Sequence, residues 1–380
     1  MFIFQQHSVY FAQVAENMES LAGEELASLG ATNVKPVYRG LHFTAEPETL
    51  YRIVYQTRLC TRILAPLRQF DCHSTKYLYR TAKDLPWTEL LRLDQTFLIN
   101  ANVSDSSGIT HSQYAALCVK DAIVDQFREQ TGQRPSVGRE EPDLVVNLHI
   151  HRNKAVISLD LSGASLHRRG YRQESVAAPM QEALAAGIIG LSGWEGDRPL
   201  LDPLCGSGTL LCEALMRCCH IPAAMLRQAF GFMRLPDFDP QLWARVRAEA
   251  DAAIRPLPEG IIRGSDADRL ATRAARNNLN RLPHGEAIAV RTARFQELEP
   301  VADAVIVTNP PYGVRLGERR AAEALVGELG TFFKHRCAGS TAYVYFGDRE
   351  LMKHIGLRPA WKKPLSNGGL PGLLAKYELY

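Results

Sequence analysis

The stretch Leu200-Leu201-Asp202-Pro203-Leu204-Cys205-Gly206-Ser207-Gly208-Thr209 decides the fold that we expect for the C-terminal half. Its leucines predict a short buried strand, and its glycines predict a tight turn that leads into a helix. Such a turn lets backbone approach a ligand closely, although a lone Gly-x-Gly turn is often only structural. The third glycine of a dinucleotide-binding fingerprint is missing. Asp202 would repel phosphate, so it suits a ligand that carries a cationic amine.

Strands and helices alternate beyond this turn. Apolar strands separated by helices predict a parallel sheet that is covered on both faces. Gly368-Gly369 predicts an antiparallel hairpin at the edge of the sheet. Residues 221–257 break the alternation and are expected to form a partly helical insertion. The expected strands are 261–265, 287–290, 304–308 and 342–346, and the expected helices are 268–280 and 320–334.

The first part of the chain predicts a small α+β unit that ends near Leu67. Its expected strands and helices, in chain order, are 9–14, 18–29, 34–43 and 50–59.

A second α+β unit follows. Ser112 is expected to cap a helix that Gly132 closes. A polar turn then joins strands 144–150 and 155–161 into a hairpin. The helix residues expected to face a core are Tyr114, Leu117, Val124 and Phe127.

The composition excludes several classes of protein. Of 380 residues, 46% are hydrophobic and 22% are charged, with a formal net charge of +3, which does not fit a disordered chain. No apolar run approaches the ~20 residues that cross a bilayer, and the N-terminus shows no secretory signal. We therefore expect a cytoplasmic protein without a membrane partner. Residues 1–160 carry 16 Lys/Arg and 18 Asp/Glu, so nucleic-acid binding must come from a local patch.

The eight cysteines do not form a metal-binding or disulfide pattern. No Cys-x-x-Cys pair occurs, and Cys218-Cys219 are adjacent on a predicted helix. We expect reduced, mostly buried thiols and no bound metal.

Asp266 stands at the end of the second strand of the expected parallel sheet. Ligands of such sheets lie outside the carboxyl ends of the strands. A carboxylate there can accept hydrogen bonds from both hydroxyls of a ribose. The alternative is that Asp266 or Asp268 only caps the next helix, and we assign the cap to Asp268.

Thr308-Asn309-Pro310-Pro311-Tyr312-Gly313 follows a later apolar strand. The two prolines fix the backbone and lack N–H groups, so carbonyl groups stay free to accept hydrogen bonds. Asn309 Oδ1 and the Pro310 carbonyl oxygen suit one planar –NH₂ group, and Tyr312 suits the ring that bears it. This pattern aligns an amine lone pair for attack on the methyl group of a sulfonium and stabilises charge developing on nitrogen. Alternatively, Asn-Pro-Pro is only the rigid start of a loop.

Taken in order, these three motifs resemble those of class I S-adenosylmethionine-dependent methyltransferases that act on exocyclic amines. The resemblance implies a Rossmann-like domain. It also implies that S-adenosylmethionine is held by Asp202, Cys205, Gly206, Ser207, Gly208, Asp266, Phe295 and Asn309, with Asn309, Pro310, Pro311 and Tyr312 as catalytic residues at the amine. One departure is Arg294, because the family commonly has an acidic residue there for the adenine amino group. Either backbone and Phe295 hold the adenine instead, or this chain binds the cofactor less tightly.

The N-terminal half resembles another known arrangement. Residues 158–163 and 166–172 are similar to the end of a THUMP domain and the linker to a methyltransferase, and 178–185 continues the similarity, with Gln181 where Lys is common. The whole chain is most similar to bacterial 23S rRNA guanine-N2 methyltransferases, as the first half of longer fused enzymes. The implied domains are 1–67 (ferredoxin-like), 68–165 (THUMP), 166–192 (linker and helix) and 193–380 (methyltransferase, with the insertion near 221–257).

A compact cationic and aromatic cluster lies in this linker. Arginines and an unstacked base fit together in RNA recognition, and reaching a paired guanine requires flipping it out. The alternative is that Tyr171 and the arginines pack at a domain junction. The candidate RNA-binding residues are Arg168, Arg169, Tyr171, Arg172 and Arg315.

The favoured reaction is therefore methylation of the N2 amine of a guanine in 23S rRNA. A tRNA substrate keeps the reaction and changes the partner. Methylation of a protein glutamine uses the same Asn-Pro-Pro-Tyr motif, but the arginine cluster of residues 168–172 does not favour this substrate. An inactive RNA-binding or ribosome-assembly factor is favoured by Arg294 and opposed by the intact Asn309–Tyr312 motif.

Overall fold

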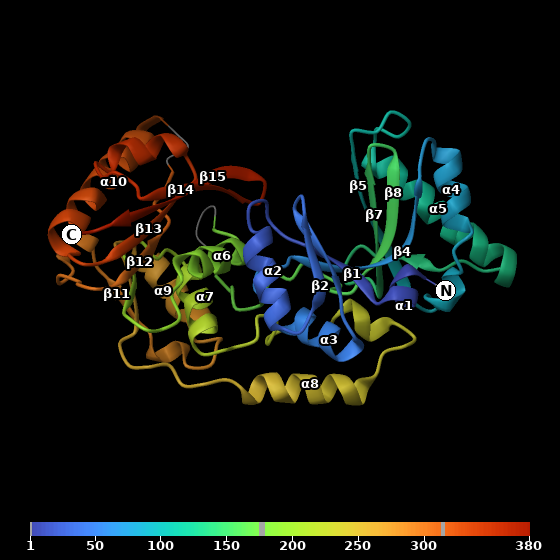
Figure 1. Ribbon diagram of the computed structural model, residues 1–380, viewed down its shortest axis with the longest axis horizontal. Coiled ribbons are helices and arrows are strands. Elements are labelled where there is room, and N and C mark those ends of the chain that lie inside the picture. The colour runs from blue at the N-terminus through green and yellow to red at the C-terminus, as the bar shows by residue number, and fades with distance from the viewer. Residues whose placement is uncertain (1, 175–178, 313–315) are drawn as a thin grey trace.

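The computed structural model describes residues 2–174, 179–312 and 316–380. The molecule is elongated, with the first unit lying between the second unit at one end and the C-terminal unit at the other (Figure 1). Two sheets, one of eight and one of seven strands, form the framework. None of the helices in the described ranges is long and apolar enough to cross a membrane.

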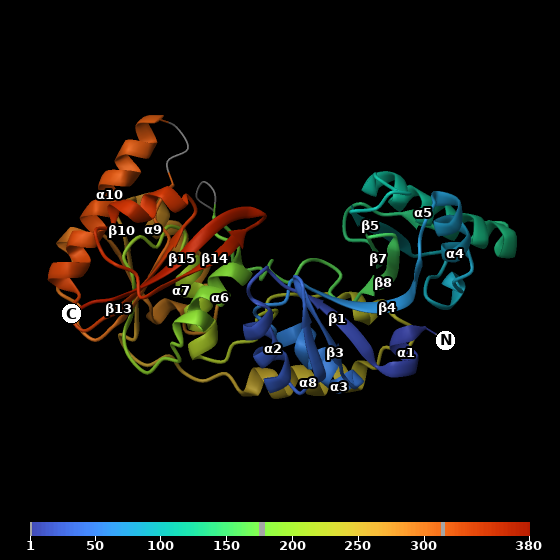
Figure 2. The same ribbon diagram turned by 45° about the horizontal axis from the view of Figure 1, so that its top comes forward.

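The first two units share the eight-stranded sheet, whose order is β2-β3-β1-β4-β8-β7-β5-β6. Strand β4 pairs with β1 of the first unit and with β8 of the second, and it can be followed from one unit into the other in Figure 2. The predicted boundary at residue 67 falls inside this strand. The strands are β1 Val9–Gln13, β2 Thr32–Val37, β3 Gly40–Thr44, β4 Arg62–Asp71, β5 Thr96–Ser104, β6 Ser136–Val137, β7 Leu144–His151 and β8 Lys154–Asp160.

Three predictions for this half, including the Ser112 cap described below, are wrong in detail. The single strand expected at 34–43 is the hairpin of β2 and β3, because the chain turns back at Arg39, which has φ 55°. Tyr114 and Leu117 are 59% and 51% exposed. The buried face of their helix is lined mainly by alanine, valine and isoleucine. The hairpin of β7 and β8 and the helix end at Gly132 are as predicted.

Helices cover the eight-stranded sheet. The Ser112 hydroxyl does not cap its own helix but accepts from the backbone N–H of Val103 at 3.1 Å, and the cap position is His111. The helices are α1 Ile3–His7, α2 Glu19–Ser28, α3 Pro47–Gln56, α4 Thr75–Lys83 and α5 Ser112–Thr131.

The C-terminal sheet has the order β11-β10-β9-β12-β13-β15-β14, with five parallel strands and an antiparallel hairpin at one edge. This confirms the predicted parallel sheet and the hairpin turn at Gly368-Gly369. Helices α6, α7 and α9 pack on one face of the sheet, and α10 packs on the other. The strands are β9 Leu200–Asp202, β10 Ile262–Asp266, β11 Ala289–Thr292, β12 Val305–Thr308, β13 Thr341–Phe346, β14 Trp361–Asn367 and β15 Leu370–Glu378. The helices of this unit are α6 Glu182–Ser192, α7 Thr209–Cys218, α9 Arg269–Leu279 and α10 Leu316–Arg336. Its short 3₁₀ turns are η3 Gly285–Ala287, η4 Phe295–Glu297 and η5 Arg349–His354. The second unit contains η1 Trp87–Glu89, and the insertion contains η2 Gly231–Arg234.

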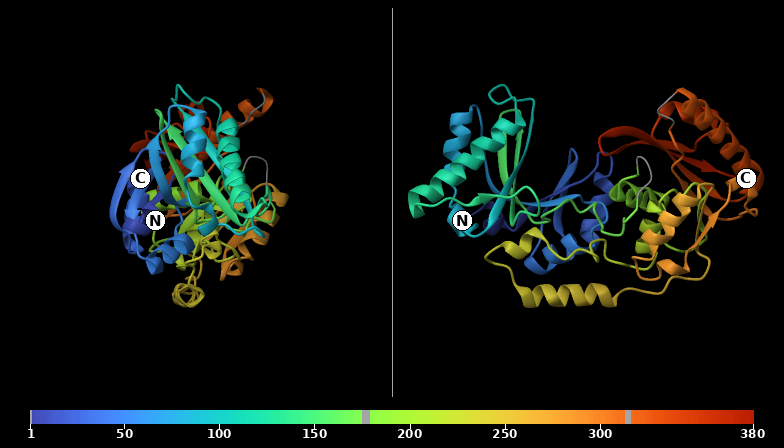
Figure 3. Two further views of the ribbon diagram at one scale, coloured as in Figure 1. Left: turned by 90° about the vertical axis from the view of Figure 1, so that its right-hand side faces the viewer. Right: turned by 180° about the vertical axis from the view of Figure 1, so that it is seen from behind.

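The insertion leaves the C-terminal sheet and returns to the first unit. Its helix α8 (Pro240–Ala252) packs against α3, and it lies along the lower edge of the molecule in Figure 3 (right). Trp243 meets the ring of Tyr55 edge-on at 5.3 Å, and Tyr55 Oη donates to Asp251 Oδ1 at 2.6 Å. The insertion therefore links the C-terminal unit to the first unit through these contacts.

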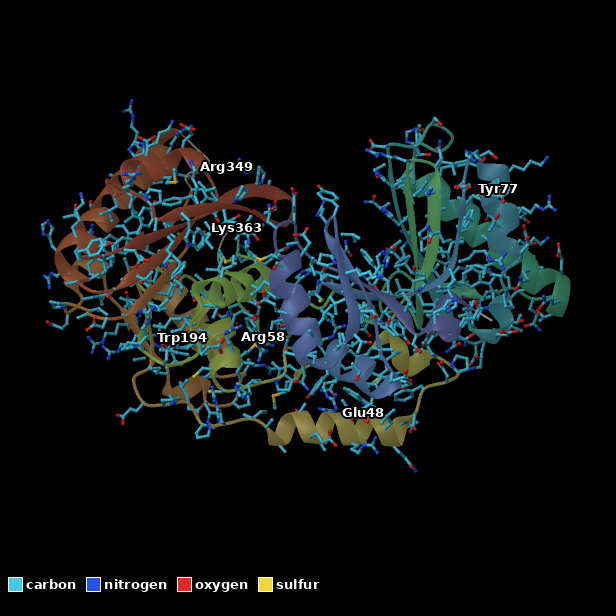
Figure 4. All side chains as sticks on the ribbon, in the orientation of Figure 1. Glu48, Arg58, Tyr77, Trp194, Arg349 and Lys363 are labelled. Carbon is cyan, nitrogen blue, oxygen red and sulfur yellow. The ribbon has the colours of Figure 1, made fainter. Side chains whose placement is uncertain are left out.

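A buried ionic cluster closes the junction between the first unit and the C-terminal unit. Arg169 is 1% exposed and its Nε lies 3.3 Å from Glu213 Oε1, an atom that also accepts from Tyr171 Oη at 3.0 Å. Arg58, labelled in Figure 4, donates to the carbonyls of Met216 and Ile221 at the end of α7. The RNA contacts predicted for Arg169 and Tyr171 are therefore wrong, since buried side chains cannot reach a nucleic acid, and the junction alternative holds for both.

Replacing Glu213 by alanine is expected to lower the free energy of unfolding by about 3–5 kcal/mol, because the Arg169 guanidinium would stay buried without its carboxylate. Urea denaturation followed by tryptophan fluorescence measures this loss. Glu328→Ala is the control, since Glu328 pairs with Arg294 on the surface at 3.7 Å and should contribute about 0–1 kcal/mol. Equal losses in the two variants would contradict the assignment.

Candidate active site

Three loops meet at the carboxyl ends of β9, β10 and β12, which are neighbours in the C-terminal sheet. The Thr308 hydroxyl at the end of β12 donates to Asp202 Oδ1 at the end of β9, at 2.9 Å. This bond brings the glycine turn beside Asn309. The sequence placed both motifs at strand ends, and the structure brings those ends together.

The glycine turn is held from several sides. Gly206 and Gly208 have φ of 52° and 81°, a region that side chains other than glycine rarely adopt. A Cβ on Gly208 would also lie 3.0 Å from the Cβ of Ala275, so α9 packs directly against the turn. Asn278 Nδ2 donates to the Ser207 carbonyl at 2.9 Å. The turn is rigid and presents backbone next to the N-terminus of α7.

Asp202 is 1% exposed, and burial raises its pKa to about 7. Its Oδ1 accepts from Thr308 and from the Leu204 backbone N–H at 3.2 Å. Within the described part of the chain no group donates to Oδ2. A buried carboxylate with one free oxygen and a raised pKa fits a cationic ligand group, which would stabilise its ionised form.

Asp266 ties the second loop to the first. Its Oδ2 accepts from the Gly206 N–H at 2.9 Å, and its Oδ1 accepts from the Asp268 N–H at the same distance. Each carboxylate oxygen keeps a further lone pair for a hydroxyl. Asp268 accepts from Leu270 N at 2.8 Å, which confirms the predicted helix cap.

The third loop carries Asn309, whose Oδ1 accepts from Tyr312 Oη at 2.7 Å. Pro311 is exposed and Pro310 is buried, while Asn309 and Tyr312 are half-buried. Burial raises the pKa of Tyr312, so its hydroxyl is a donor at neutral pH. Asn309 Oδ1, the oxygen predicted to accept from the target amine, therefore already accepts a hydrogen bond from Tyr312 of the same motif.

Two predicted cofactor residues are placed differently from expectation. Phe295 is 2% exposed and packs edge-on against Phe332 at 5.5 Å, so its ring belongs to the core under α10 and does not face a ligand. Cys205 is buried, with its backbone N–H donating to the Ser265 carbonyl at 2.9 Å, and burial raises the pKa of its thiol. The backbone N–H and carbonyl of Cys205 therefore hold the glycine turn in place, because the carbonyl accepts from the Gly208 N–H at 2.8 Å. Arg294 is exposed and pairs with Glu328.

The predicted RNA-binding residues are also separated by the structure. Arg172 donates to the Met180 carbonyl at 2.7 Å and to Thr209 Oγ1 at 3.0 Å, so its guanidinium is used inside the protein. Arg168 is exposed. Arg315 lies outside the described residues.

Three residues that the sequence analysis did not assign shape the site. Thr308 joins two strand ends, and Asn278 holds the glycine turn. Gly347, just after β13, leaves room for the Tyr312 ring. A polar residue at the end of an apolar strand, or on the apolar face of a helix, is the only sequence signal for the first two.

Comparison with known proteins finds matches along almost the whole chain. A family model described as "RMKL-like, methyltransferase domain" matches residues 169–376, a THUMP domain matches 72–160, and an RlmL ferredoxin-like domain matches 10–64. A Synechocystis protein named "Putative RNA methyltransferase" is 41% identical, covering 98% of this chain and 97% of that protein. The ribosomal RNA large subunit methyltransferase K/L of Syntrophotalea carbinolica is 39% identical and covers 97% of this chain. The chain spans 53% of that relative's length.

Solved structures agree with this placement. A structure named "a putative methyltransferase complexed with SAH" matches with a TM-score of 0.86 and 27% identity, covering 98% of both chains. A "possible methylase" from Clostridium difficile 630 matches with a TM-score of 0.87 and 26% identity over 98% of both chains. The resemblance drawn from the sequence motifs is confirmed. The chain belongs to the RMKL-like methyltransferase family, with an RlmL ferredoxin-like domain and a THUMP domain ahead of its methyltransferase domain.

Proposed function

We propose that this protein methylates the N2 amine of a guanine in the RNA of the large ribosomal subunit, with S-adenosylmethionine as the methyl donor. The observation that carries the proposal is the bond between Thr308 and Asp202, which sets an amine-binding loop beside a cofactor-type glycine turn. Bound S-adenosylmethionine supplies an electrophilic methyl group on a sulfonium.

The residues of the glycine turn fit that cofactor. The free oxygen of Asp202 suits the ammonium of the methionine part, and the backbone of residues 205–208 lines the same turn. Asp266, already bonded to Gly206, suits the ribose hydroxyls. Since Phe295 is buried and Arg294 points to Glu328, the adenine is left to backbone groups near the end of β11.

Asn309 and Pro310 orient the amine. The Asn309 side-chain oxygen and the Pro310 carbonyl oxygen accept hydrogen bonds from the two N–H groups of a planar amine, so that its lone pair points out of the ring plane. The same oxygens would stabilise the positive charge that develops on nitrogen as the N–C bond forms, while the methyl C–S bond breaks and its electron pair stays on the sulfur of S-adenosylhomocysteine. The methylated nitrogen then releases its proton to water, so no strong base is needed.

The choice of RNA rests on the relatives. Those named ribosomal RNA large subunit methyltransferase K/L are about twice as long as this chain, and the Synechocystis relative of equal length is named only for RNA. A tRNA substrate is the second candidate, which the THUMP domain also suits. The cytoplasmic location and the domain boundaries stay predictions. Nucleoside mass spectrometry of rRNA and tRNA from cells with and without the gene tests the substrate: loss of N2-methylguanosine from rRNA supports the proposal, and unchanged rRNA contradicts it.

Asn309→Ala is expected to lower kcat for RNA methylation by about 10²–10³-fold, because the carbonyl that orients the amine is lost. Binding of S-adenosylhomocysteine, measured by calorimetry, should stay within a few-fold. Asn309→Asp keeps an acceptor oxygen and should be less impaired. Equal turnover in wild type and Asn309→Ala would remove the proposed role.

The affinity for S-adenosylhomocysteine is expected to fall about tenfold per pH unit below pH 7. Burial holds the pKa of free Asp202 at about 7, and the bound ammonium lowers it, so below pH 7 a proton must leave before the ligand binds. Calorimetry from pH 5.5 to 8 measures the slope. Asp202→Asn still accepts from Thr308 and Leu204 and should lose the pH dependence. A flat wild-type profile would contradict the assignment.

Arg168→Ala is expected to weaken RNA binding and to reduce the slope of log K against log salt by about 1, because one exposed cation leaves the RNA backbone. Filter binding at several salt concentrations measures both. Arg245→Ala on α8, which removes a surface arginine paired with Glu48, is the control and should change neither. An unchanged slope in Arg168→Ala would place Arg168 outside the RNA interface.

A further inference from the structure

We propose that the Tyr312 hydroxyl occupies the amine-binding oxygen of Asn309 between turnovers, and that Gly347 is the positioning residue that makes this resting arrangement possible. The inference rests on the proposed function, because Asn309 Oδ1 is the atom assigned to the target amine. It adds that the target amine must displace the Tyr312 hydroxyl from Asn309 Oδ1.

The contact geometry defines the resting arrangement. Tyr312 Oη lies 2.7 Å from Asn309 Oδ1. The hydroxyl-bearing end of the ring lies against Gly347: a Cβ built there would meet Cζ at 2.2 Å, Cε2 at 2.4 Å and Cε1 at 2.5 Å. Real Cβ atoms do not approach other atoms so closely, so an alanine at this position would push the ring away.

The location of Gly347 explains why it reaches the site. It follows β13, which pairs in parallel with β12, and Thr308 lies opposite Val344 in that pairing. Gly347 and Asn309 therefore stand at the same edge of the sheet, just beyond adjacent strands. The Tyr312 ring also packs against the apolar core on the α6–α7 side, which stabilises it in this place.

The resting bond affects how the substrate binds. The carboxamide oxygen has two lone pairs, and the half-buried Tyr312 phenol donates to one of them at 2.7 Å. In the proposed arrangement the target amine takes the lone pair that the phenol uses, so the amine displaces this donor and the Tyr312 ring moves toward the face of the base. One net hydrogen bond corresponds to an affinity difference of roughly two- to tenfold.

Tyr312→Phe tests the competition directly, because it keeps the ring and removes the donor. The expected result is a KM for unmethylated large-subunit rRNA that is lower by about two- to tenfold. Tyr345→Phe is the matched control: this neighbouring hydroxyl donates to the Leu365 carbonyl at 3.3 Å and not to Asn309, so its KM should not change. A tenfold loss of kcat in Tyr312→Phe would overturn the proposal, since the hydroxyl would then act in the reaction itself.

Gly347→Ala tests whether the Tyr312 ring must lie against Gly347 to make the resting bond. Its methyl group would push the ring away and break the resting bond, so adding Tyr312→Phe to it should change KM no further. Additive effects would overturn the role of Gly347.

A readout without turnover separates this inference from the proposed function. The side-chain amide of Asn309, assigned in a ¹⁵N spectrum by its loss in Asn309→Ala, should shift in Tyr312→Phe and Gly347→Ala but not in Tyr345→Phe. An amide that stays unchanged in Tyr312→Phe would overturn the resting arrangement even if the protein methylates RNA. A shifted amide in a protein without RNA methylation would keep the contact and remove only the function.

Discussion

The whole site depends on one buried hydrogen bond, from the Thr308 hydroxyl to the carboxylate of Asp202. It is possible because β9 and β12 are adjacent and parallel, so that both chains leave the sheet at the same edge. Because Thr308 and Asp202 are both buried, such a bond to a charged or partly charged group is strong and directional. It fixes the distance between two loops that are about a hundred residues apart in sequence, and Asp266 fixes the third loop through Gly206. The glycine turn and the loop that carries Asn309 are thus joined by hydrogen bonds into one site.

The sequence predicted what local patterns determine. Alternating apolar strands and helices gave the parallel sheet, the paired glycines gave the edge hairpin, and Asp268 was assigned correctly as a cap. These features depend on neighbouring residues and on backbone geometry, which the chain carries in its own order. The strand expected at 34–43 was wrong because the chain turns back at Tyr38-Arg39, and the glycine beside this turn, Gly40, stands inside the stretch that the apolar pattern assigned to one strand.

The sequence could not predict which side chains become buried between units. Arg169 and Tyr171 look like an RNA-binding cluster until Glu213, from a helix more than forty residues later, is placed against them. Phe295 looks like an adenine partner until Phe332 covers it. In each case the deciding neighbour comes from a distant segment, and charge or aromatic character alone does not say whether water or protein will surround a residue. The confirmed family membership constrains the motifs but not these contacts.

The strand β4 serves both N-terminal units, and this has a consequence for how the chain can be divided. A cut at residue 67 would leave half a strand on each fragment and two unpaired sheet edges, which are templates for aggregation. We therefore expect the ferredoxin-like and THUMP domains to fold as one unit. A chimaera that exchanges one of them between relatives must either carry the complete strand through Asp71 or rebuild its pairing on both sides.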